Sequence, residues 1–123
     1  MEWFRQIELP LPEEEISARC KLHNLPELCA SIYKVENISA DHLSAQIECV
    51  WGIFTIVSTP IRHGVRFALA NCPNALQWTI TSDREGSLIH CSINQKITDP
   101  DFSDSIQQLM EDFRLGLGSQ KTE

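Results

Sequence analysis

The stretch LSAQIECVW, residues 43–51, decides the fold class because every second residue in it is apolar. Alternation with a period of two is typical of a strand that buries one face. Gly52 then breaks or bulges the strand. The β-branched run Ile53–Ser58 is consistent with a strand buried on both faces or with a continuation past the bulge, and Pro60 should end it. The apolar members of the alternation are Leu43, Ala45, Ile47, Cys49 and Trp51.

Further segments on both sides of this stretch have the same period of two. The segment Ile16–Leu22 has a competing interpretation, a helical turn over Glu13–Arg19. Near the other end of the chain, Gly86 supplies the turn of a hairpin between two alternating segments. The predicted additional strands cover Trp3–Leu9, Ile16–Leu22, Val65–Leu69, Leu76–Ile80 and Ile89–Ile93.

Two segments have helical spacing instead. The first begins at Asn24, a good N-cap with Glu27 placed as in a capping box, and should end near Val35 or Glu36. The second begins at Asp99-Pro100 and should stop at Gly116. Its apolar stripe consists of Phe102, Ile106, Leu109, Met110, Phe113 and Leu117.

The predicted order of elements is therefore β-β-α-β-β-β-β-β-α. It predicts an α+β fold in which a curved, mostly antiparallel sheet of five to seven strands is packed on one face by two helices. At 123 residues the chain is expected to form a single domain over residues 1–117, with a disordered tail over 118–123.

Composition narrows the classes of function. The formal net charge of −7 argues against general nucleic-acid binding and against docking on an anionic membrane. No long apolar run or secretory signal is present, so we expect a cytoplasmic location. Five cysteines, an odd number at wide spacing, are expected to be reduced and free of metal.

No group of residues in the sequence has the spacing that a catalytic site, a metal site or a cofactor site requires. Cys20, His23 and Cys29 form the closest cluster of soft ligands, but on one strand Cys20 and His23 would face opposite ways. His90 and Cys91 are adjacent, so on a strand they also point apart and cannot act as base and nucleophile. Glycine-rich phosphate loops are absent as well.

One local group of basic side chains remains as a candidate binding site. Arg62, His63 and Arg66 lie within five residues of each other in an otherwise acidic chain. They could hold an anionic group of a ligand or partner, although a solvated loop explains the same pattern.

The segment Leu76–Leu117 contains a Trp-bearing strand, a glycine turn, a second strand and an acid-capped helix. In this architecture it loosely resembles the last part of YbjN-type and type III secretion chaperone-like domains. Those domains begin with a helix, whereas this chain is predicted to begin with strands. The resemblance implies a role in binding peptides or proteins.

Three hypotheses about function follow. The first is a protein- or peptide-interaction module, loosely chaperone-like, that acts without catalysis through a protein partner or as a homodimer. The sheet edge at Trp3–Leu9 is then the favoured contact, because an edge strand presents unpaired backbone groups. The alternative is a small-molecule binding domain, or an enzyme, with a pocket between sheet and helices. The third is a purely structural subunit of a larger assembly.

Overall fold

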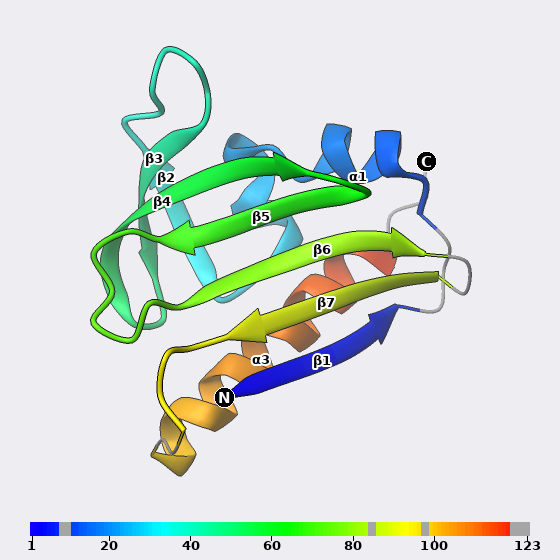
Figure 1. Cartoon of the computed structure of the whole chain (residues 1–123). Helices are drawn as coiled ribbons and strands as arrows, with labels where there is room; N and C mark the ends of the chain where they lie inside the picture. The colour runs from blue at the N-terminus through cyan, green and yellow to red at the C-terminus, as the bar shows by residue number, and fades with distance from the viewer. Residues whose placement is uncertain (8–10, 84–85, 97–98, 119–123) are drawn as a thin grey trace.

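A computed structural model describes residues 1–7, 11–83, 86–96 and 99–118, and a single antiparallel sheet of seven strands forms its centre. The strand order is β1-β7-β6-β5-β4-β3-β2, so β2 to β7 follow one another as hairpins and β1 joins β7 (Figure 1). β1 and β2 are consequently the edge strands. The strands are β1 (Glu2–Ile7), β2 (Ile32–Glu36), β3 (Ser44–Cys49), β4 (Gly52–Ile61), β5 (Gly64–Leu69), β6 (Gln77–Asp83) and β7 (Gly86–Ser92).

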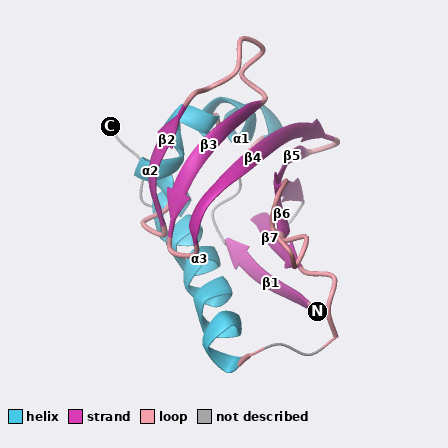
Figure 2. Cartoon of the chain, turned by 90° about the vertical axis from the view of Figure 1, so that its left-hand side faces the viewer, coloured by secondary structure: helices cyan, strands magenta, loops and turns pink. Residues whose placement is uncertain are grey.

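All helices lie on one side of the sheet, which curves around the longest of them (Figure 2). This confirms the predicted α+β class and the curved antiparallel sheet, but the described residues form three helices and a 3-10 turn where two helices were predicted. None of the described helices is long and apolar enough to cross a membrane. The elements are α1 (Glu13–Arg19), the 3-10 turn η1 (Leu22–Asn24), α2 (Leu25–Leu28) and α3 (Pro100–Gly118).

Aromatic packing fills the space between α3 and the sheet. Trp78 of β6 contacts Phe67 of β5 and Phe113 of α3, with ring centroids 5.6 and 5.9 Å apart, and all three side chains are fully buried. The predicted apolar stripe of α3 faces this core, with Phe102 only partly buried at its start. Burial of such side chains stabilises the fold by about 2 kcal/mol each.

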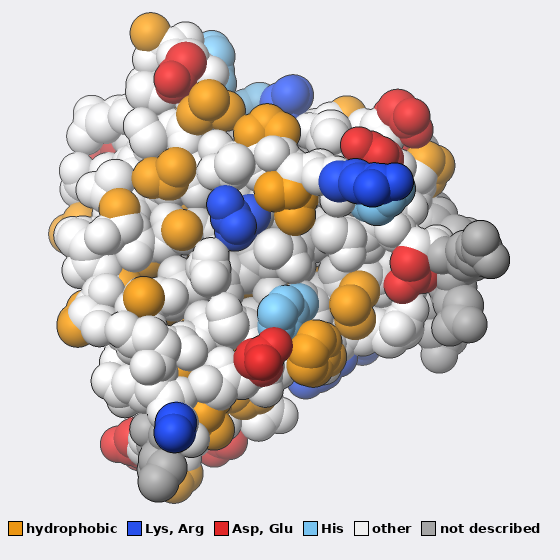
Figure 3. All heavy atoms as spheres, in the orientation of Figure 1, with side chains coloured by type: hydrophobic (Ala, Val, Ile, Leu, Met, Phe, Trp, Pro, Cys, Tyr) orange, Lys and Arg blue, Asp and Glu red, His pale blue; other side chains and the backbone are white. Residues whose placement is uncertain are grey.

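The outer face of the sheet carries both polar and hydrophobic side chains. Hydrophobic groups are scattered among polar ones over its described part and do not form one continuous patch (Figure 3). Phe4 on β1 is 60% exposed and stacks on the His90 ring at 4.5 Å, while His90 Nε2 lies 2.7 Å from Glu2 Oε1.

The C-terminal end of α3 is fixed by the segment that precedes β2. The Arg19 guanidinium donates to the carbonyl oxygens of Gly116 and Leu117 at 3.2 and 3.0 Å, which satisfies groups that a helix end leaves unpaired. Gly116 lies directly against the backbone of Leu28. Gly116 is therefore a point of close approach inside the helix and not the predicted stop, since α3 continues to Gly118.

Indole hydrogen bonds join the first turns of α3 to β1 and to the β3–β4 turn. Trp3 Nε1 donates to Ser103 Oγ at 3.2 Å, and Trp51 Nε1 donates to Ser105 Oγ at 2.7 Å. Asp99 accepts the Asp101 N–H through its side chain at 2.8 Å, as the predicted N-terminal signal requires.

The predicted second strand at Ile16–Leu22 is wrong, and the competing helical interpretation is confirmed by α1. The alternation misled because Ile16 and Cys20 are four residues apart, a spacing that also places them on one face of a helix. Three glutamates in the first turn interact favourably with the helix dipole, and the Cys20 N–H closes the helix on the Ile16 carbonyl.

The predicted helix from Asn24 to Glu36 is also wrong. The helix that forms here, α2, ends at Leu28, well before the predicted end. Ile32–Glu36 instead forms β2, which pairs with β3 in the register Val35↔Ile47. The Asn24 side chain makes no capping hydrogen bond and instead donates to the Arg19 carbonyl at 3.3 Å. Sheet pairing therefore overrides an apolar spacing that suits a helix.

The strand predictions hold better in the middle of the chain. The alternating stretch forms β3, and Gly86 adopts a φ of +142° in the predicted hairpin turn. Gly52, with a φ of +118°, follows a turn and pairs with Cys49, so Ile53–Ser58 belongs to the separate antiparallel strand β4 and does not continue β3 past a bulge. Ile53 is 59% exposed, so this run is not buried on both faces either. β4 runs through Pro60 to Ile61 and does not stop at the proline. The end of the predicted first strand and residues 119–123 of the predicted tail lie outside the described residues, while Gly118 belongs to α3.

Replacement of Gly116 by alanine should destabilise the protein by about 2 kcal/mol, because a Cβ there would lie 2.0 Å from the Leu28 carbonyl oxygen. Gly118→Ala is the matched control, since a Cβ at that position meets nothing within 4 Å. Urea unfolding of both variants measures the difference. Equal stability of the two variants would contradict the close packing of α3 on α2.

Candidate functional site: a pocket beside the first helix

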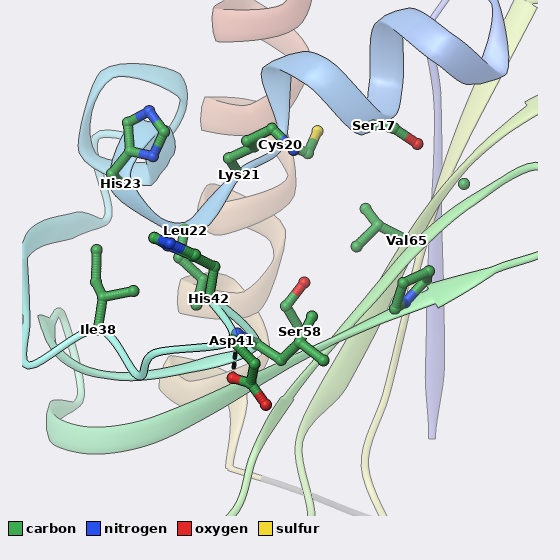
Figure 4. Close-up of a pocket in the computed structure, with 13 residues that line it drawn as sticks. Ser17, Cys20, Lys21, Leu22, His23, Ile38, Asp41, His42, Ser58 and Val65 are labelled. Atoms are coloured by element: carbon green, nitrogen blue, oxygen red, sulfur yellow. Dashed lines mark hydrogen bonds between the residues drawn. The ribbon is translucent and has the colours of Figure 1, made fainter.

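A pocket with a volume of about 540 Å³ lies away from the aromatic core. Its walls come from α1 and η1, from the β2–β3 loop (residues 37–43), and from the β4–β5 hairpin (Figure 4). The lining residues are Ser17, Cys20, Lys21, Leu22, His23, Ile38, Asp41, His42, Leu43, Ser58, Pro60, Gly64 and Val65.

The deep part of the pocket is apolar. Cys20, Leu22 and Val65 are buried, and they contribute a thiol and two aliphatic side chains to the lining. Gly64 completes this part at a point where β5 lies close against β6, since a Cβ there would lie 1.9 Å from the Ile80 carbonyl oxygen. Only glycine can occupy that position, so the pocket wall is flat backbone at this point.

The Cys20 thiol lines the pocket but is a poor nucleophile at neutral pH. Burial raises its pKa to about 12, although the neighbouring Arg19 charge lowers it somewhat. The thiolate is the nucleophilic form of cysteine, and it is almost absent at neutral pH when the pKa is this high. Cys20 therefore contributes apolar surface to the pocket and not an activated nucleophile.

The β2–β3 loop is held in shape by its own hydrogen bonds. Asp41 Oδ1 accepts the Ser39 hydroxyl at 2.6 Å and the Leu43 N–H at 3.0 Å, and these bonds lower the pKa of the Asp41 carboxyl. Ser39 Oγ also accepts the Ser44 N–H at 3.1 Å. His42 adopts a left-handed φ of +62°, which turns the chain back toward β3.

The rim of the pocket is polar. Lys21 and His23 come from η1 and its N-cap, whereas Asp41 and His42 come from the loop opposite (Figure 4). The exposed side chains of the rim and the buried apolar floor together give the pocket an amphipathic lining.

The basic residues singled out in the sequence do not line this pocket. His63 Nδ1 lies 3.7 Å from Glu13 Oε1, so the turn between β4 and β5 contacts α1 through this pair. Arg66 pairs with Thr59 and Thr79 across the sheet, on the outer face, and Arg62 belongs to the turn. A binding role for Arg62, His63 and Arg66 stays a prediction.

Two residues of the pocket were present in the rejected metal cluster. Cys20 and His23 both face the pocket because α1 and η1 replace the predicted strand that would have separated them. Cys29 does not join them, since its thiol lies 3.7 Å from the Leu109 carbonyl under α3. Among the described residues, no group of three His, Cys, Asp or Glu side chains is placed to hold a metal ion.

A second, smaller pocket of about 150 Å³ lies near the start of α3, beside Trp51, Phe102 and the β5–β6 loop. This volume is below the range of about 300–1,000 Å³ that is usual for small-molecule sites. The larger pocket is therefore the better candidate.

No protein-family model matches the chain, and no curated protein is similar to it in sequence. Solved structures are similar in fold. The protein XoxI from Bacillus cereus has a TM-score of 0.66 at 11% identity, covering 95% of this chain and 92% of that one. A START superfamily protein from Mycobacterium smegmatis gives the same score and identity, covering 95% and 94%.

An uncharacterised protein from Bacillus thuringiensis is less similar, with a TM-score of 0.56, 12% identity, and coverage of 92% and 98%. Each match spans nearly the whole of both chains, so the arrangement of the sheet and helices described above is shared with these three proteins. At these identities the likeness concerns the fold.

The thiols should show the pattern that their burial implies. Burial raises the pKa of Cys20, Cys29 and Cys91 to about 12. The pKa of the buried Cys49 thiol is raised as well, whereas the Cys72 side chain is partly exposed. Titration with a thiol reagent at pH 8 should therefore modify Cys72 alone in the folded protein and all five cysteines after denaturation. Fewer than five thiols in the denatured protein would contradict the prediction of reduced cysteines.

Proposed function

We propose that the protein binds a small, largely apolar molecule in the pocket between α1, η1 and the β2–β3 loop. The observation that carries this proposal is the pocket itself, whose volume of about 540 Å³ lies within the usual range for small-molecule sites. Its buried apolar floor would take the body of the ligand, and its polar rim would orient it.

The chemistry of the pocket favours binding over catalysis. The one thiol is held protonated by burial. The described structure shows no hydrogen bond from the hydroxyl of Ser17 or Ser58 to a histidine, as nucleophilic activation would need. The proposed activity is therefore reversible binding.

The position of the pocket also supports this function. The space between α3 and the sheet is already filled by Trp78, Phe67 and Phe113. A ligand that entered there would have to displace fully buried aromatic rings, whereas the pocket beside α1 is open without any rearrangement.

An uncharged fluorescent probe, N-phenyl-1-naphthylamine, tests the proposal. We expect binding at one probe per chain, and Ser17→Trp should weaken it by about tenfold or more because the added ring occupies the pocket. Glu14→Trp is the control, since Glu14 is exposed on the same helix outside the lining. Binding that is absent, or unaffected by Ser17→Trp, would refute this function.

The interaction hypothesis is retained as a second candidate because β1 is an edge strand. One side of β1 pairs with β7, and Phe4 on this strand is 60% exposed. Two copies could therefore associate through β1 across a two-fold axis, which would extend the sheet.

For the second candidate, light scattering after size exclusion should give twice the 14.0 kDa chain mass. A monomer at about 100 µM would rule out the homodimer hypothesis, since closed dimers with a standard interface persist at such concentrations.

A further inference from the structure

Basic and hydrogen-bond-donating side chains gather at one end of the pocket. Lys21 and His23 extend from η1 at this end, and His42 reaches the same rim from the loop (Figure 4). The chain as a whole has only ten lysines and arginines and a net charge of −7, so a group of such side chains at the mouth of this pocket is unexpected.

These side chains are not used by the fold. In the described structure, the side chains of Lys21 and His23 have no hydrogen-bond or ion-pair partner. Several other basic groups of the chain are engaged: Arg19 binds the end of α3, Lys34 pairs with Glu36 at 2.8 Å, and His90 pairs with Glu2. In the described structure, Arg62, Arg66 and Lys96 also have no side-chain partner, but they do not line the pocket. The rim donors are therefore available to a ligand.

Asp41, the one acidic residue in the lining of the pocket, already accepts hydrogen bonds from its own loop. Asp41 Oδ1 accepts hydrogen bonds from Ser39 and Leu43, and these bonds, with a smaller effect of the neighbouring His42 charge, lower the pKa of the Asp41 carboxyl. Figure 4 shows the Asp41 carboxylate on the opposite side of the pocket from Lys21 and His23. An anion would be repelled by Asp41 and attracted by Lys21, so the two sides of the rim give it one orientation.

We infer that the ligand is an anionic amphiphile: an apolar body on the floor of Leu22 and Val65, and one carboxylate, sulfonate or phosphate-ester group held by Lys21 and His23, with His42 beside them. This rests on the proposed function and specifies its ligand. The Lys21 ammonium supplies the charge, and the imidazole N–H groups supply directed hydrogen bonds.

Two probes with the same ring system isolate the anionic group. 1-Anilinonaphthalene-8-sulfonate carries one sulfonate, and N-phenyl-1-naphthylamine lacks it. We expect the sulfonate to bind wild-type protein more tightly than the uncharged probe, although the overall negative charge of the protein would disfavour it. The binding of both is followed by fluorescence, with Ser17→Trp used to define the pocket-bound fraction.

The Lys21→Met variant should weaken sulfonate binding by about three- to fivefold, the range of a solvent-exposed ion pair, and leave the uncharged probe unchanged. Lys96→Met is the matched control, because it removes the same charge from an exposed residue outside the pocket. His23→Gln should reduce sulfonate binding in the same direction, through the loss of the imidazole donor.

The outcomes separate the two proposals. If the uncharged probe binds and the sulfonate binds no tighter, or if Lys21→Met and Lys96→Met weaken the sulfonate equally, the anionic ligand is refuted and the pocket remains a binding site. If neither probe occupies the pocket, the proposed function and this inference both fail.

Discussion

The packing of Phe113 on Trp78 is the contact on which the arrangement of the molecule depends. These rings, with Phe67, close the interior between α3 and the curved sheet. Because the interior is full, the available space lies at the side, where α1 and η1 stand off from the β4–β5 hairpin and the β2–β3 loop. The same contact thus stabilises the fold and determines where a ligand can enter.

Contacts made both outside the lining and within it hold the walls of the pocket in place. Arg19 ties the end of α1 to the carbonyl end of α3, and Glu13 at the start of α1 lies beside His63 in the β4–β5 turn. Asp41 and Ser39 fix the opposing loop through local hydrogen bonds. Both sides of the pocket are therefore preorganised, which lowers the entropic cost of binding.

The strands were predictable where burial of one face imposes a period of two, as at β3 and at the β6–β7 hairpin. The segment from Glu13 to Glu36 was not, because its apolar spacing fits both structures and long-range pairing with β3 decides the outcome. The pocket was not predicted either, because the incorrect strand at Ile16–Leu22 hid it. Its residues come from three separate segments, and a strand at Ile16–Leu22 would have placed Cys20 and His23 on opposite faces.

The pairing of β1 with β7 has a consequence for how the protein is made. Glu2 is in register with Ser92, so the first strand meets its only sheet neighbour across some ninety residues of chain. The hairpins from β2 to β7 can form in succession as each strand leaves the ribosome, but Trp3 and Ile7 must wait until β7 has emerged. The N-terminal strand is then the last part of the sheet to be added, and its apolar face is open to molecular chaperones throughout that interval.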